Sequence, residues 1–216
     1  MKQLIQQSKI FLGLYLVFFI AGGFIFFNME RGNEILYFNS LHTPFFDEFF
    51  KRITQIAELP MLVLILAIAI RFGYGTGLIL TVNAGLALVT NSILKKFIFA
   101  SQIRPAVFFE AKHVQLNFVH GVEPLTKESF PSGHAAAAFA LFFMLSILMK
   151  NKMWNIIFFI MALLVAVSRV YLLQHFFRDV YFGSLIGMLV TTGFYLTFVQ
   201  SKYYQNITWK DKVLLK

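Results

Sequence analysis

The chain has 216 residues, of which 58% are hydrophobic, 18% are aromatic and only 13% are charged, whereas soluble domains typically carry about 25% charged residues. This composition excludes an ordinary soluble domain, a disordered chain and a collagen-like chain, and it indicates an integral membrane protein. The formal charge of +9 is explained better by basic cytoplasmic loops and contact with anionic lipids than by nucleic-acid binding. Because the chain contains no cysteine, a disulfide framework, a thiolate zinc site and a cysteine nucleophile are excluded.

The first predicted span is an uncharged apolar run at residues 10–27, whose length of about 27 Å matches a hydrocarbon core of ~30 Å. It is longer than a signal-peptide core and lacks a clear cleavage site, so we expect an uncleaved anchor. Residues 28–54 combine charges with aromatic side chains, which predicts a segment lying along the membrane surface. A second span at 59–70 is short and needs residues 53–58 to reach full length.

The third span is predicted at residues 77–94, where Asn83 and Asn91 indicate packing against other helices rather than lipid. Residues 100–130 then form a long polar connection, and loops of that size are usually functional. The last three spans are predicted at 131–149, 153–167 and 180–199. We therefore expect an all-α polytopic membrane protein of six transmembrane helices, forming a single domain over residues 1–216.

Six spans place both termini on one side of the membrane, where the short loops and tails carry nine basic residues and one acidic residue. The other side carries ten basic and nine acidic residues. By the positive-inside rule the termini are cytoplasmic and the 100–130 loop is extracytoplasmic. The sequon at Asn206 then falls on the cytoplasmic side, and we interpret it as a chance match. Glu58 lies near the outer end of the second span, where we expect a carboxylate at the level of the lipid headgroups.

Three clusters of charged and histidine residues border the spans on the outer side. They are Lys95-Lys96 with Arg104-Pro105, then Pro131-Ser132-Gly133-His134, and finally Ser168-Arg169 with His175 and Asp179. Because the outer ends of spans three to six are free to converge, these clusters are candidates for one shared site.

The second cluster begins a helix with Ser132 and Gly133, so that free backbone N–H groups and the positive end of the helix dipole face outward. This arrangement predicts an anion site. A plain helix cap explains Ser132 equally well, but His134 directly after the cap favours a functional interpretation.

In the third cluster His175 and Asp179 are four residues apart, which puts them on one helical face if the sixth span begins early enough. A carboxylate bonded to one ring nitrogen makes the other nitrogen the better nucleophile or base. Arg169 offers a guanidinium fork suited to phosphate. A lone His–Asp pair is more commonly a surface pair, but the cations on the same side favour a phosphoryl-transfer site.

A metal site is the competing interpretation. The three clusters contain no cysteine and one acidic residue, Asp179, while cations crowd them. Such surroundings repel a divalent ion, and we expect neither a metal nor a cofactor. His42, His113 and His120 have no motif partners, and we expect them to be surface histidines.

The three clusters resemble the three-part signature of the type 2 phosphatidic acid phosphatase family, over about residues 55 to 200. The second motif is complete, and the third, S-R-x5-H-x3-D, matches at every fixed position. The first departs from the family pattern K-x6-R-P, because position 97 is Phe and Lys96 lies one residue too far from Arg104. We assign the lysine role to Lys96 and keep Lys95 as its substitute.

The resemblance implies that His175 attacks phosphorus to form a phosphohistidine, that Asp179 orients it, and that His134 protonates the departing group and then activates water. It further implies that the phosphate oxygens are bound by Lys96, Arg104, Ser132, Gly133 and Arg169. It also implies an enzyme that needs no metal.

These expectations describe a multi-pass inner-membrane lipid phosphatase whose active site faces the extracytoplasmic side. The expected substrates are undecaprenyl diphosphate, phosphatidylglycerophosphate and phosphatidic acid, with a lipid A phosphate as a further candidate. Two alternatives stay open: transfer of the phosphoryl group to a hydroxyl other than water, and a lipid-binding or transport protein without turnover. Transport folds usually show paired repeats and broken helices, and the sequence shows neither. The oligomeric state is not indicated.

Overall fold

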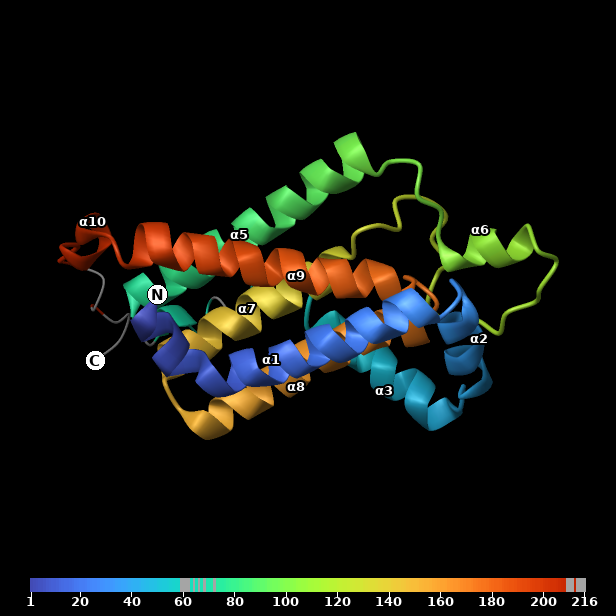
Figure 1. Cartoon of the computed structure of the whole chain (residues 1–216), viewed down its shortest axis with the longest axis horizontal. Helices are drawn as coiled ribbons and strands as arrows, with labels where there is room; N and C mark the ends of the chain where they lie inside the picture. Colours follow the sequence, from blue (N-terminus) through green and yellow to red (C-terminus); the bar gives the residue numbers. More distant parts are fainter. Residues whose placement is uncertain are drawn as a thin grey trace.

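The computed structural model describes residues 1–58, 63, 65, 67, 69–71, 73–208 and 212. Within this part of the chain all regular secondary structure is helical, with no strand, which confirms the all-α class. The long helices run side by side in an elongated bundle (Figure 1). The start of α1 (Lys2–Asn28) and the short α10 (Lys202–Gln205) lie at one end of this bundle, and α6 (Pro105–Glu110) lies at the other.

Four helices of the described chain are long and apolar enough to cross a membrane, and they coincide with the predicted spans one, three, five and six. They are α1, α5 (Tyr74–Ile93) with its wider final turn Leu94–Ile98, α8 (Lys152–Tyr171), and α9 (Phe177–Phe194) with its final turn Tyr195–Val199. The shorter apolar helix α7 (Gly133–Met149) coincides with span four. The predicted second span, 59–70, lies largely outside the described residues.

Helix α7 forms the centre of the bundle, because its alanine-rich first half lets neighbouring backbones approach closely. Residues Ala135 to Met144 are all buried. A Cβ added at Gly183 of α9 would lie 2.5 Å from the carbonyl oxygen of Ser132, and one at Gly187 would overlap that of Ala136. Small residues at such spacing are typical of close helix pairs in membranes. The two glycines thus let the first halves of α7 and α9 pack in close contact.

The predicted surface segment folds into α2 (Asn33–Ser40) and α3 (Pro44–Gln55). Thr43 caps α3 by accepting a hydrogen bond from the Phe46 N–H at 3.3 Å, and a proline at the first helical position suits the fixed φ of that ring. Helix α3 is tied to α8 by the Tyr171 hydroxyl, which donates to Asp47 Oδ1 at 2.6 Å. The first turn of α3 therefore lies beside the end of α8.

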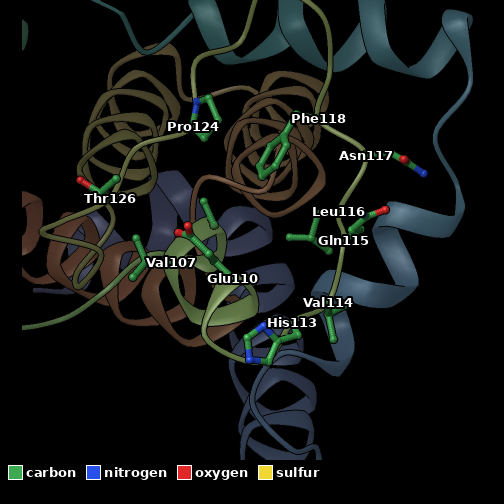
Figure 2. A pocket seen from close by; sticks show the side chains of 11 residues that line it. Val107, Glu110, His113, Val114, Gln115, Leu116, Asn117, Phe118, Pro124 and Thr126 are labelled. Atoms are coloured by element: carbon green, nitrogen blue, oxygen red, sulfur yellow. The ribbon is translucent and has the colours of Figure 1, made fainter.

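The long connection between α5 and α7 is irregular apart from α6. It is held to the preceding helices by the Asn39 amide, which donates to the Asn117 carbonyl at 2.7 Å, and by Lys51 Nζ, which donates to the His120 carbonyl at 3.1 Å. Between α6 and the stretch 113–118 it encloses a cavity of about 720 Å³, whose wall includes Glu110 (Figure 2). This connection covers the same end of the bundle as α2 and α3.

Candidate active site

His175 lies in the short turn that joins α8 to α9. The N–H groups of Gln174 and His175 both donate to the Arg169 carbonyl, at 2.9 and 3.1 Å. Because α9 begins at Phe177, His175 precedes the helix, and the condition under which His175 and Asp179 would share one helical face is not met. Its Nδ1 still lies 3.4 Å from Asp179 Oδ2, since side chains in a first helical turn point back toward the N-terminus.

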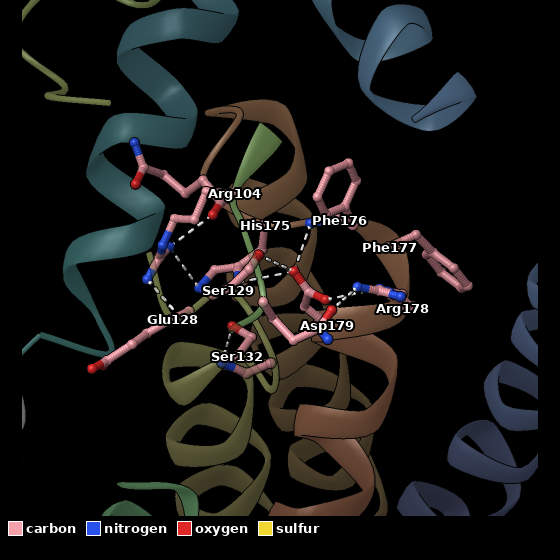
Figure 3. Close-up of polar contacts among 12 residues, drawn as sticks. Arg104, Glu128, Ser129, Ser132, His175, Phe176, Phe177, Arg178 and Asp179 are labelled. Atoms are coloured by element: carbon pink, nitrogen blue, oxygen red, sulfur yellow. Dashed lines mark hydrogen bonds and ion pairs between the residues drawn. The ribbon is translucent and has the colours of Figure 1, made fainter. Parts of the chain in front are cut away.

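The Asp179 carboxylate is fully buried and is held by contacts from three directions (Figure 3). Its Oδ2 accepts hydrogen bonds from Ser129 Oγ at 2.5 Å and from the Phe176 N–H at 3.0 Å, and its Oδ1 lies 3.4 Å from Arg178 Nε. Hydrogen bonds and a nearby guanidinium favour the charged carboxylate. Ser129 and Arg178 were missed by sequence reasoning, since neither belongs to a recognisable spacing pattern.

Arg104 reaches the other ring nitrogen of His175. Its Nη1 lies 3.2 Å from His175 Nε2 and also donates to the Gln174 carbonyl at 2.7 Å. The remaining nitrogens donate to the carbonyls of Lys127 at 2.8 Å and Glu128 at 3.3 Å. These contacts fix the guanidinium at the one imidazole nitrogen that does not face Asp179.

The imidazole of His175 is only 2% exposed. Burial lowers the pKa of His175 to about 3, with Asp179 opposing the shift and the Arg104 and Arg169 guanidinium groups adding to it. His175 is therefore neutral near pH 7. A neutral imidazole whose Nδ1 faces a carboxylate presents the lone pair of Nε2, as a nucleophile requires.

The second cluster meets the third at the start of α7. Ser132 caps this helix, its Oγ accepting from the Ala135 N–H at 3.4 Å, while its own N–H donates to the Asp179 carbonyl at 2.9 Å. Gly133 is the first helical residue. His134 Nε2 is buried and has no hydrogen-bond partner among the described residues. Its imidazole is within electrostatic range of Lys95, Arg104, Arg169 and His175.

Arg169 lies in the last turn of α8 and is 6% exposed. Its Nη1 donates to Thr54 Oγ1 of α3 at 2.7 Å, and its Nε is buried with no hydrogen-bond partner in the described part of the chain. Arg104 and Glu58 are within electrostatic range of its guanidinium. Glu58, expected at headgroup level, thus lies near a residue of the third motif.

Of the two candidate lysines, Lys95 lies beside the cluster. Its side chain is half-buried and within electrostatic range of Arg104, Arg169 and Asp179, whereas the side chain of Lys96 is exposed. The placement expected for Lys96 is therefore corrected in favour of Lys95. The reason is helical phase, because Lys95 follows the buried Asn91 by one turn and Lys96 is rotated a further ~100°.

Asn91 is a further polar residue at this site. It is 4% exposed, and its Nδ2 lies 3.2 Å from where a Cβ of Gly133 would be. Sequence reasoning assigned it to helix packing, a role that Asn83 does fill by donating to the Ala140 carbonyl at 2.9 Å. Asn91 also packs against another helix, and it places its amide at the first residue of α7.

The remaining histidines lie outside this cluster. His42 Nε2 contacts the Tyr171 carbonyl at 3.1 Å, while His113 and His120 lie in the long connection between α5 and α7. Over the described residues, His, Cys, Asp and Glu side chains form no group of three or more that could hold a metal ion.

A family model described as the PAP2 superfamily matches residues 76–203, more than half of the chain. The chain belongs to the PAP2 superfamily. The resemblance inferred from the three motifs is thereby confirmed. All three lie at the converging helix ends described above.

Similar proteins agree with this membership. The chain is 28% identical over 160 residues to a lipid A 4'-phosphatase from Bacteroides thetaiotaomicron, covering 71% of this chain and 70% of that protein. The crystal structure of LpxE from Aquifex aeolicus matches with a TM-score of 0.64 at 29% identity, over 73% of this chain and 90% of that one. A PAP2-type phosphatidylglycerolphosphate phosphatase from Bacillus subtilis matches with a TM-score of 0.60 at 25% identity, over 87% and 93%. The expectation of a membrane-bound phosphoric ester hydrolase is confirmed.

Proposed function

We propose that this PAP2 protein hydrolyses a phosphate monoester or diphosphate of a membrane lipid through a phosphohistidine formed on His175. The observation that carries the proposal is the placement of His175 between Asp179 at Nδ1 and Arg104 at Nε2. A neutral imidazole oriented by a carboxylate, with a cation where the phosphate must arrive, is an arrangement suited to phosphoryl transfer.

In the first step, His175 Nε2 attacks phosphorus, forming a P–N bond while the P–O bond to the lipid breaks. His134, which is protonated once the anionic substrate phosphate is bound beside it, donates a proton to the departing oxygen. In the second step, neutral His134 takes a proton from water, whose oxygen attacks phosphorus and breaks the P–N bond to release inorganic phosphate. Asp179 stabilises the positive charge that develops on His175 during the attack.

The phosphate oxygens are bound by cations and by N–H groups at the start of α7. We assign this role to Lys95, Arg104, Ser132, the Gly133 N–H and Arg169, with the Asn91 amide beside them. Arg104 Nη1 leaves His175 Nε2 when the substrate phosphate enters, because the same guanidinium then binds an equatorial oxygen. These groups stabilise charge on the transferring phosphoryl group without a metal.

We further propose the membrane arrangement of six spans, with cytoplasmic termini and the site at the extracytoplasmic face of the inner membrane. Basic residues of the terminal side would then contact anionic lipids. The candidate substrates are phosphatidylglycerophosphate, phosphatidic acid, undecaprenyl diphosphate and a lipid A phosphate. The Bacillus subtilis and Bacteroides thetaiotaomicron proteins favour the first and the last of these.

Phosphate release from these four lipids by purified protein in detergent, with excess chelator present, tests the function. We expect release from at least one lipid at a rate that chelator leaves unchanged. Activity that disappears with chelator and returns with a divalent ion would contradict the metal-independent mechanism. Absence of release from all four by folded protein would contradict the proposed function.

The lysine assignment predicts unequal effects of two neighbouring substitutions. Lys95→Ala is expected to lower kcat/KM by about 100-fold, as the loss of one preorganised cation from a phosphoryl-transfer site does. Lys96→Ala is expected to remain within about 2-fold of the native protein, because an exposed charge contributes little. Steady-state phosphate release measures both, and a larger loss for Lys96→Ala would reverse the assignment.

A further inference from the structure

A second, smaller cavity adjoins the active site. It has a volume of about 320 Å³ and lies between α3, the end of α8 and the stretch 121–125 of the long connection. Its polar lining includes Lys51, Thr54, Glu58, Glu123, Arg169 and Gln174. Because Arg169 belongs to the third motif, this cavity shares a wall with the proposed phosphate site.

Gln174 connects the cavity to the nucleophile. It directly precedes His175, and its carbonyl accepts from Arg104 Nη1 at 2.7 Å. Its side chain extends the other way, where Nε2 donates to the Glu123 carbonyl at 3.0 Å. One residue thus contacts the phosphate-binding arginine through its backbone and the cavity rim through its side chain.

Two residues that line this cavity each have one buried polar atom without a partner in the described part of the chain. Gln174 is 2% exposed and its Oε1 accepts no hydrogen bond, while the buried Nε of Arg169 donates none. A buried polar atom without a partner costs free energy that a ligand can recover. Oε1 requires a donor and Nε requires an acceptor, so the ligand should present both.

The charges on the cavity wall further restrict the chemical class of ligand that fits. Glu58 and Glu123 place two carboxylates on the lining beside two cations, Arg169 and Lys51, so the charges formally balance, and Lys51 Nζ also donates to the His120 carbonyl at 3.1 Å. A charge-balanced wall favours a neutral group over a charged one, and its carboxylates accept hydrogen bonds from hydroxyl groups. The geometry points to a headgroup subsite that receives a neutral, hydroxyl-bearing group attached to the scissile phosphate, with Gln174 Oε1 as one acceptor.

This inference rests on the proposed function and deepens it, because it ranks the candidate lipids. Phosphatidylglycerophosphate carries a glycerol hydroxyl beside its terminal phosphate, and a lipid A phosphate carries sugar hydroxyls. Phosphatidic acid and undecaprenyl diphosphate carry none. A site built to hydrogen-bond a hydroxyl discriminates strongly against an analogue that lacks it.

The test compares kcat/KM for these four lipids between the native protein and Gln174→Met, which removes the acceptor at similar side-chain volume. We expect the native protein to prefer the hydroxyl-bearing pair, and Gln174→Met to lower kcat/KM for that pair by about 10-fold, as loss of one hydrogen bond in a buried site does. Phosphatidic acid should change by less than about 2-fold. The glycerol and sugar lipids, tested separately, distinguish the two sources of the hydroxyl.

A second test variant and a matched control accompany Gln174→Met. Glu123→Ala removes a carboxylate from an exposed position and should lower the preference for hydroxyl-bearing lipids without loss of folded protein. Gln115→Met is the matched control, because Gln115 lines the 720 Å³ cavity instead. It should leave the order of the four lipids unchanged.

An equal loss on all four lipids in Gln174→Met would overturn the subsite, since it would show that the side chain acts through His175 or the long connection. Equilibrium binding of the same lipids separates this result from failure of the proposed function. A native protein that turns over none of them would contradict the proposed function. In that case the subsite still predicts that the native protein binds hydroxyl-bearing lipids more tightly than the other two lipids, and that Gln174→Met loses this difference. Equal binding of all four lipids by the native protein would overturn the subsite.

Discussion

His175→Asn is expected to lower kcat by about 10⁴-fold or more, because removal of a nucleophile leaves only the contributions of substrate binding and charge stabilisation. Asparagine keeps a polar side chain in a position that is 2% exposed, and its amide can still donate toward Asp179. The folded structure is therefore expected to persist. Steady-state phosphate release measures the loss, and thermal unfolding in detergent checks the fold.

The same variant distinguishes the nucleophile from a residue that only positions the substrate. Native protein that is given a substrate with a radiolabelled phosphate and then denatured at alkaline pH should carry base-stable, acid-labile phosphate on one histidine, and His175→Asn should carry none. His113→Asn is the control, because His113 lies in the long connection on the wall of the 720 Å³ cavity. Labelled phosphoenzyme in His175→Asn would refute the assignment of the nucleophile.

The expected effect of this substitution depends on a chain of contacts that no single motif contains. Ser129 and the Phe176 N–H hold Asp179, Asp179 faces His175 Nδ1, and Arg104 occupies the position next to Nε2. Each contact restricts the imidazole to one orientation. Such preorganisation is the main way in which a protein lowers the barrier of a phosphoryl transfer.

Much of this site could be predicted from the sequence, because its motifs lie at the ends of apolar runs. Hydropathy places Arg169 and the Ser132 cap at one end of the bundle, and the structure brings both to His175. The residues at which the helices begin were harder to predict from the sequence. Leu173 adopts a left-handed φ of 56°, which prevents α8 from continuing to His175, and α9 begins at Phe177, before the predicted start at residue 180.

The lysine could not be assigned by counting residues. Both lysines lie in the wider turn Leu94–Ile98 that continues α5, and the rotation of that turn, rather than the distance to Arg104, decides which side chain faces the cluster. The contacts of Ser129 and Gln174 likewise join segments about 50 residues apart. Such pairs become visible only when the helices are packed.

The packing of α7 on α9 leads to the second large prediction. Gly187→Val is expected to destabilise the folded protein by about 3 kcal/mol or more, at the upper end of overpacking costs. The added Cβ would overlap the Ala136 carbonyl and lie 2.9 Å from the Ala140 nitrogen. Both are backbone atoms, so relief requires a shift of α7 itself. Thermal unfolding in detergent and the yield of folded protein measure this effect.

Gly193→Val is the matched control on the same helix, because a Cβ at Gly193 meets nothing within 4 Å. Both variants introduce the same β-branched residue into α9, so the difference between them isolates the contact with α7 from helix propensity. The free energy of unfolding of Gly193→Val should lie within about 1 kcal/mol of that of the native protein. Equal stability of the two variants would contradict the close α7–α9 packing.

Disruption of the α7–α9 contact should also lower the catalytic activity. The Ser132 N–H donates to the Asp179 carbonyl at 2.9 Å across these two helices, so a shift of α7 separates the phosphate-binding turn from the nucleophile. A misplacement of about 1 Å at reacting groups can cost about 100-fold in rate. Residual folded Gly187→Val should therefore show a lower kcat than Gly193→Val, in addition to its lower stability.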